Sequence, residues 1–192
     1  MTVKNLMVGI VSSIAIFTLA ACGADNKETS PAEETTASEN VQTNHSDMNH
    51  SSSGEVPEDL KEAKNPTYKI GSQAILEADH MKGMKGAKAT IVGAYDTTAY
   101  VVSYTPLTGG NTVNDHKWVI HEEIKEAGNE TLKPGTKVTL EADHMEGMKG
   151  AAAEIESAEK TTVYMVDYMP TTGGDEVKNH KWVTESELSP LK

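Results

Sequence analysis

A short stretch that occurs twice carries the residues best suited to chemistry. The copies begin at Glu77 and Glu141, 64 residues apart, and ten of their eleven positions are identical, reading E-A-D-H-M-[K/E]-G-M-K-G-A. Each copy places an imidazole, two thioethers and a carboxylate on one glycine-rich segment. Thioether sulfur is a soft ligand and imidazole a borderline one, so together they suit copper better than calcium or magnesium. We therefore interpret the stretch as a candidate copper site.

One stretch supplies two or three ligands, so a further ligand must come from another part of the fold. The best candidates are histidines that recur just before a later strand. The predicted metal ligands are His80, Met81, Met84, His116, His144, Met145, Met148 and His180. Asp79 and Asp143 are weaker candidates, either as Cu(II) ligands or as acceptors that orient an imidazole. The thioethers favour Cu(I), and Cu(II) is the second candidate.

A structural interpretation of the same residues stays open. Methionine fills irregular gaps in cores, and a histidine can be buried with its hydrogen bonds satisfied. Duplication preserves structural and functional residues alike, so identity between the copies does not separate the two. The chain has nine methionines and one phenylalanine, and four of the methionines lie beside histidine in this motif. That bias favours metal ligation by at least part of the motif.

The start of the chain has the pattern of a lipoprotein signal. Lys4 precedes an apolar run at residues 6–21 that is too short for a comfortable transmembrane span. The run ends in L-A-A-C, and Cys22 is the only cysteine of the chain. We expect residues 1–21 to be removed and Cys22 to be acylated, which would anchor the protein to the outer face of the cell membrane. An ordinary secretory signal with a chance cysteine is the alternative.

Residues 22–56 read as a disordered tether. They are rich in small polar and acidic residues and have no aromatic side chain, so they cannot bury enough apolar area to offset the entropy of ordering. His45, Met48 and His50 lie within the tether and are weaker metal candidates, although accidental histidines in a polar linker explain them equally well. The net charge of −12 argues against nucleic acid as a partner.

From residue 67 the chain repeats without insertion or deletion, which divides it into a first repeat domain at 57–128 and a second at 129–192. Residues rich in β-formers predict strands at 88–92, 99–104, 117–120, 136–141 and 163–168. Short helices are predicted at 57–64 and 185–188. The fold class is therefore mainly β, and the strand number favours two tandem small SH3-like β-barrels with Trp118 and Trp182 as core anchors.

The motifs together resemble a known family. A lipobox, a polar tether with histidine and methionine, and two copies of E-A-D-H-M-x-G-M-K-G-A, Y-x-V-x-Y-x-P, T-G-G and [N/D]-H-K-W-V are similar to the YdhK-like lipoproteins of Gram-positive bacteria. Some members, called CopL, are associated with copper resistance. The resemblance implies a surface lipoprotein that binds copper outside the cell.

The functional hypothesis is an extracellular, membrane-anchored lipoprotein that sequesters or buffers copper, with copper ions and a copper-handling or cell-wall component as partners. The alternative is a non-metal module that binds cell wall or protein. We expect no enzyme activity. The sequence has no cysteine nucleophile beyond Cys22, no Gly-x-Ser-x-Gly, no His-Glu-x-x-His and no phosphate-binding glycine loop.

Overall fold

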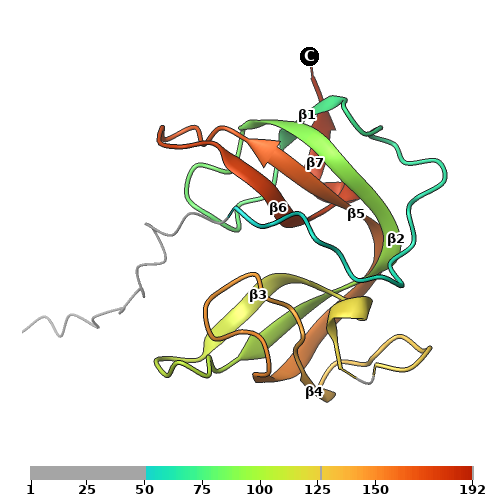
Figure 1. The fold of residues 1–192 in the computed structure, drawn as a ribbon, viewed down its shortest axis with the longest axis vertical. Coiled ribbons are helices and arrows are strands. Elements are labelled where there is room, and N and C mark those ends of the chain that lie inside the picture. Colours follow the sequence, from blue (N-terminus) through green and yellow to red (C-terminus); the bar gives the residue numbers. More distant parts are fainter. Residues whose placement is uncertain (1–50, 126, 192) are drawn as a thin grey trace, which may run out of the picture. The chain divides into compact units, whose positions relative to one another are not determined.

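The computed structural model describes residues 51–125 and 127–191, which form seven strands and two 3₁₀ turns (Figure 1). The elements are β1 (Gln73–Leu76), β2 (Lys88–Tyr104), β3 (Val113–Ile120), η1 (His121–Glu123), β4 (Lys137–Thr139), β5 (Ala152–Tyr168), β6 (Val177–Thr184), η2 (Glu185–Glu187) and β7 (Leu188–Pro190). The prediction of a mainly β protein is confirmed. Among the described residues there is no α-helix, and none of their helical turns has the length and apolar character needed to cross a membrane.

The strands β2 and β5 pair antiparallel along almost their whole length. Their register runs from Ala89 opposite Tyr168 to Tyr104 opposite Ala153. Midway, Thr97 lies opposite Thr161, which is its own equivalent in the second repeat. A strand residue that faces its own repeat partner lies on an approximate twofold axis. The two repeats are therefore joined in the centre of one sheet, where the two long strands run together in Figure 1.

The sheet is open. Its order is β4-β5-β2-β1-β7, with β3 paired to β2 and β6 paired to β5. The strands predicted separately at 88–92 and 99–104 are one continuous strand of 17 residues. Because this strand continues from one core into the other and pairs with β5 along almost its whole length, the sheet does not close into barrels, and the predicted SH3-like barrels are not confirmed.

Each of the two outer hydrophobic cores combines halves of both repeats. The first core joins β1 and the start of β2 to the end of β5, β6 and β7, and it includes Leu76, Met84, Ile91, Tyr164 and Val183. The second core is its counterpart and includes Tyr100, Val119, Leu140, Met148 and Ile155. The first half of each sequence repeat thus packs on the second half of the other repeat.

A central core lies between the two outer cores, at the middle of the paired strands β2 and β5. It contains Ala99, Val163 and both tryptophans, Trp118 at 6% exposure and Trp182 at 0%. The tryptophans were predicted as core anchors, and their burial confirms this.

The helix predicted at 57–64 is wrong. A single turn forms at its start, where Leu60 N donates to Pro57 O at 3.2 Å, and the rest of the segment bonds to β2: Ala63 N donates to Ala94 O and Asp96 N donates to Lys61 O, both at 3.0 Å. Leu60 is buried in the central core. Edge pairing to a long strand satisfies the backbone groups that a short helix would leave open at its ends. The helical turn predicted at 185–188 is present as η2.

The exchange of halves makes a prediction for a chain cut between the repeats. A protease site inserted at the exposed turn around Gly128 and Asn129 should give two fragments on a denaturing gel. The two fragments should still elute together in size-exclusion chromatography without denaturant, because every core needs both. Elution of two separate fragments after cleavage would contradict the packing described here.

Candidate functional site

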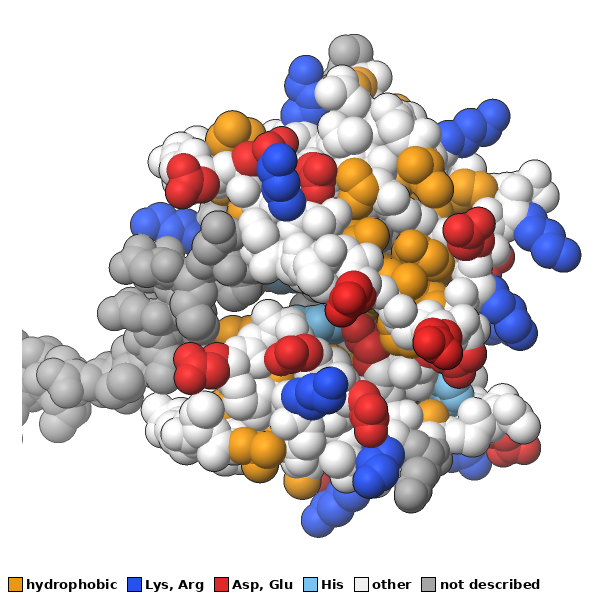
Figure 2. Space-filling view, viewed as in Figure 1, with side chains coloured by type: hydrophobic (Ala, Val, Ile, Leu, Met, Phe, Trp, Pro, Cys, Tyr) orange, Lys and Arg blue, Asp and Glu red, His pale blue; other side chains and the backbone are white. Residues whose placement is uncertain are grey.

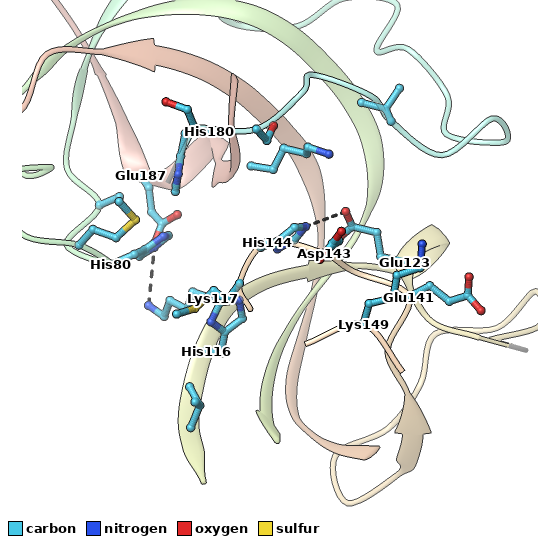
Figure 3. A pocket seen from close by; sticks show the side chains of 18 of the residues that line it. His80, His116, Lys117, Glu123, Glu141, Asp143, His144, Lys149, His180 and Glu187 are labelled. Atoms are coloured by element: carbon cyan, nitrogen blue, oxygen red, sulfur yellow. Dashed lines mark hydrogen bonds and ion pairs between the residues drawn. The ribbon is translucent and has the colours of Figure 1, made fainter. Parts of the chain in front are cut away.

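A cavity of about 970 Å³ is lined by the repeated motifs of both halves of the chain. Figure 3 shows four histidines around this one space, His80, His116, His144 and His180. Figure 2 shows histidine surface within a hollow that crosses the face of the molecule. The other predicted ligands in the lining are Met81, Met145, Asp79 and Asp143. The cavity therefore gathers eight predicted ligands from positions up to about a hundred residues apart in the sequence.

The loop that follows β1 presents its first residues to the cavity and buries its last ones. Met84 N donates to Met81 O at 3.1 Å, which curls the chain. Gly83 has φ +80°, and a Cβ there would lie 2.5 Å from Thr172 Oγ1 of the T-G-G turn in the other repeat. Only glycine tolerates both the left-handed backbone and this close approach. The same constraint acts at Gly147.

The curl separates the methionines of the motif into two kinds. Met81 and Met145 line the cavity. Met84 and Met148 are 0% exposed and belong to the first and second cores. Spacing alone did not distinguish them. The structure places Met84 and Met148 as packing residues and leaves Met81 and Met145 as the motif thioethers that line the cavity with the histidines, although Met145 also packs against the second core.

Each motif histidine is held by a glutamate that the sequence analysis missed. His80 Nε2 lies 2.6 Å from Glu187 Oε1, and Trp118 Nε1 donates to Glu187 Oε2 at 2.7 Å. An ionised carboxylate only accepts, so Nε2 carries the hydrogen. His80 and Trp118 belong to the first repeat and Glu187 to the second, so this trio ties the repeats together.

The same trio recurs with the repeats exchanged. His144 Nε2 lies 2.7 Å from Glu123 Oε1, and Trp182 Nε1 donates to Glu123 Oε2 at 3.0 Å. A sequence signal for both glutamates existed, since each stands five residues after a tryptophan in a recurring W-V-x-x-x-E pattern. Their pairing with a histidine of the opposite repeat was not visible without the exchange of halves.

The 3₁₀ turns fix the two carboxylates. Each glutamate ends its turn and accepts from the backbone that precedes it: Ile120 N donates to Glu123 Oε2 at 3.2 Å, and Thr184 N donates to Glu187 Oε2 at 3.1 Å. Glu77 N, at the start of the motif loop, donates to Glu187 O at 2.8 Å. The turn and the loop are thus bonded side by side, which brings carboxylate and imidazole together.

The environment lowers the pKa of both carboxyls. Burial raises the pKa of Glu123, but the charge and hydrogen bond of His144 and the donors Trp182 and Ile120 outweigh it. Burial likewise raises the pKa of Glu187, and the hydrogen bond and charge of His80, with the donor Trp118, outweigh it. Both side chains are therefore carboxylates at neutral pH. They are two of the acidic side chains that line the cavity, together with Asp79 and Asp143.

The second nitrogens of the motif histidines have no hydrogen-bond partner among the described residues. Nδ1 of His80 and Nδ1 of His144 are both buried. With the hydrogen on Nε2, a neutral ring keeps its lone pair on Nδ1. The His144 ring lies 6.2 Å from the ring of His116, centre to centre. Tyr104 contacts His116 edge-on at 5.7 Å, and Tyr168 contacts His180 in the same way at 5.9 Å.

The candidate ligands are gathered but not preassembled. Within residues 51–125 and 127–191, no three histidine, cysteine, aspartate or glutamate side chains form a group that could hold a metal ion. Cys22, His45, Met48 and His50 lie outside the described residues. An ion that binds in the cavity must therefore draw in ligands through side-chain movement, or use thioether sulfur as well as nitrogen.

The lowered carboxyl pKa values predict acid-sensitive stability. Such a group stabilises the folded state above its unfolded-state value near 4.5, and this stabilisation is lost as pH falls through the lower folded-state pKa. Glu123→Gln should cost about 3–5 kcal/mol of unfolding free energy at pH 7, because it leaves His144 without its charged partner. The cost should shrink below pH 4. Urea unfolding across pH measures it.

The exposed Glu146 provides the control for this measurement. Glu146→Gln should change the unfolding free energy by less than about 0.5 kcal/mol at any pH. A cost of Glu123→Gln that is equal at pH 7 and pH 3 would show that the carboxylate charge does not stabilise the fold.

Comparison with known proteins places the chain in a family. The sequence matches the family described as "Protein of unknown function (DUF1541)" at residues 70–121 and again at 134–185. "Uncharacterized protein YdhK" of Bacillus subtilis (strain 168) is 60% identical over 189 residues, which cover 98% of this chain and 91% of that protein.

Two solved structures from Bacillus subtilis are similar. The crystal structure of a DUF1541 family protein (ydhK) at 2.00 Å resolution has a TM-score of 0.73 and 70% identity, covering 76% of this chain and 99% of that one. The solution NMR structure of the ydhK C-terminal domain has a TM-score of 0.61 and 72% identity, covering 64% and 92%. The resemblance to the YdhK-like family is confirmed, and the chain belongs to the DUF1541 family.

Proposed function

We propose that the protein binds copper, above all Cu(I), in the cavity between the repeated motifs, and that it sequesters or buffers the metal at the outer face of the cell membrane. The observation that supports this most directly is the meeting of four histidines with Met81 and Met145 in one cavity. Nitrogen and thioether sulfur are the donors that a soft monovalent ion prefers.

The pairing of histidine with carboxylate supports the proposal further. Histidines that bind metals commonly donate their other N–H to a carboxylate, which fixes the tautomer and makes the ring a better ligand. His80 with Glu187 and His144 with Glu123 have this arrangement. A buried nitrogen without a partner costs about 1–3 kcal/mol, and a bound ion at Nδ1 would remove that cost.

The ring spacing fits a shared ion. Two imidazoles that bind one ion from opposite sides, each at about 2.0 Å, have ring centres roughly 6 Å apart. The His116 and His144 rings are 6.2 Å apart. Because Nδ1 of His144 is buried, neighbouring side chains must move before an ion reaches it.

The two kinds of methionine provide the sharpest test. Met81→Leu with Met145→Leu should weaken Cu(I) binding at least tenfold, because thioether sulfur is lost from the cavity. Met84→Leu with Met148→Leu is the matched control: it should leave Cu(I) affinity unchanged and cost about 1.5 kcal/mol or less per site, since volume and apolarity in the cores are kept. Competition with a chromophoric Cu(I) chelator under anaerobic conditions measures both pairs, using the chain from Gly23.

Two results would count against the proposal. If the parent chain takes no Cu(I) from the chelator, the cavity is not a copper site and the non-metal binding module becomes the better hypothesis. If both methionine pairs bind like the parent, the thioethers are not ligands. Zn(II), which gains little from thioether sulfur, should bind both methionine variants as it binds the parent.

The membrane location rests on the sequence L-A-A-C that ends at Cys22. Cells that express the full chain and are fed an alkyne-labelled fatty acid should label the protein and retain it in the membrane fraction. Cys22→Ala should abolish the label, because the acylated sulfur is gone, and should prevent processing at the lipobox. Labelling that survives Cys22→Ala would refute the lipid anchor.

A further inference from the structure

The approximate twofold axis gives the cavity two related candidate sites. The His80 site consists of His80, Met81, Glu187 and Trp118, and the His144 site consists of His144, Met145, Glu123 and Trp182. Perfect symmetry would make their affinities equal. Differences in charge and contact break the symmetry. Three of them favour the His144 site, and one acts against it, because Lys149 lines the cavity and its equivalent Lys85 does not.

The first difference is a lysine beside one carboxylate. Lys117 Nζ lies 3.9 Å from Glu187 Oε1, the same oxygen that pairs with His80. The negative charge that would stabilise a cation on His80 is therefore shared with an ammonium group. No such ion pair joins Lys181 to Glu123 in the described part of the chain, although Lys181 is the repeat equivalent of Lys117.

The second difference explains why Lys181 is engaged elsewhere. Its Nζ donates to the backbone oxygen of Glu55. Glu55 belongs to a segment that runs along β6, where Ser52 N donates to Lys178 O at 3.0 Å and Ser52 Oγ donates to Asn179 O at 2.6 Å. These hydrogen bonds join the segment to β6 of the second repeat, and in the described part of the chain no equivalent bonds join it to β3. Lys181 Nζ lies 5.9 Å from the centre of the Trp182 ring, but its ammonium group is bonded to a backbone oxygen, whereas that of Lys117 is paired with a carboxylate oxygen of the His80 site.

The third difference is the single substitution between the two motif copies. Position 82 is lysine in the first copy, next to Met81, and its equivalent 146 is glutamate in the second copy, next to Met145. Both side chains are exposed. The loops are otherwise identical, so this exchange changes the charge beside the two sites by two units without changing the ligands.

We propose that the two sites are unequal, and that the His144 site binds a soft monovalent cation before the His80 site because Lys117 and Lys82 act against the cation at the latter. This inference rests on the proposed function. A unit charge at 4 Å in a watery environment changes affinity by about fivefold, and more where water is partly excluded. The His144 site should therefore bind about tenfold more tightly.

The two tryptophans of the chain report the two sites separately. Trp118 donates to the carboxylate of the His80 site and Trp182 to the carboxylate of the His144 site. Their indole N–H groups give two peaks in a proton–nitrogen NMR spectrum, which a Trp118→Phe variant assigns. Silver nitrate in a chloride-free buffer supplies a soft monovalent ion that is not oxidised in air. The Trp182 peak should move during the first equivalent of Ag(I) and the Trp118 peak during the second.

Charge variants on the exposed loops test the cause. Lys82→Glu with Glu146→Lys should narrow or reverse the order in which the peaks move. Lys69→Glu with Lys133→Glu changes the charge at two equivalent exposed positions outside the cavity lining and should keep the order. Lys117→Met should tighten the His80 site, whereas Lys181→Met should leave the order as it is. None of these side chains is a proposed ligand or a core residue.

The outcomes separate the inference from the proposed function. Simultaneous movement of the two peaks, or earlier movement of Trp118, would overturn the inference while leaving a metal-binding protein. An order that the Lys82 and Glu146 exchange does not alter would remove that pair as a cause. Ag(I) that binds by calorimetry without moving either indole would place the ions outside this cavity, and absence of binding would overturn the proposed function together with the inference.

Discussion

The pairing of β2 with β5 is the interaction on which the rest of the structure depends. With Thr97 opposite Thr161, the register is fixed at the twofold axis, and each outer core then has a counterpart related by that axis. The pairing carries each long strand out of one core and into the next. It also brings the motif loop of one repeat beside the glutamate turn of the other, so the cavity exists only because the halves are exchanged.

The trios of histidine, glutamate and tryptophan contribute both to the stability of the fold and to the geometry of the candidate site. A carboxylate in a buried place is costly unless it is bonded, and Glu123 has three donors around it, from His144, Trp182 and Ile120. The same bonds that satisfy the carboxylate orient the imidazole toward the cavity. A structural role for these histidines therefore does not argue against the proposed binding role, because the same hydrogen bond is compatible with both.

The residue types of the candidate site could be predicted from the sequence, but most of their spatial arrangement could not. Periodicity and the 64-residue offset gave the β class, the repeat and the buried tryptophans, since these depend on local pattern. The division of Met81 from Met84 depends on a curl imposed by a turn of the other repeat near Thr172. The carboxylate partner of His80 is Glu187, 107 residues away. The sequence of a repeat is the same whether its halves pack within one copy or across two copies, so this pairing could not be predicted.

The exchange of halves also sets an order of events for the growing chain. Leu76 and Met84 belong to a core whose other wall, from Tyr164 to Leu188, is among the last parts of the protein to be made. Until then the first half of the first repeat lacks the surface that covers its apolar side chains, whereas the buried residues of the second core, from Tyr100 to Ile155, are already present in the growing chain. Contacts between residues so distant in sequence form slowly, and until they form the unfinished chain exposes hydrophobic surface that favours aggregation. In a polypeptide built in this way, the part that is synthesised first is the last to have its apolar side chains covered.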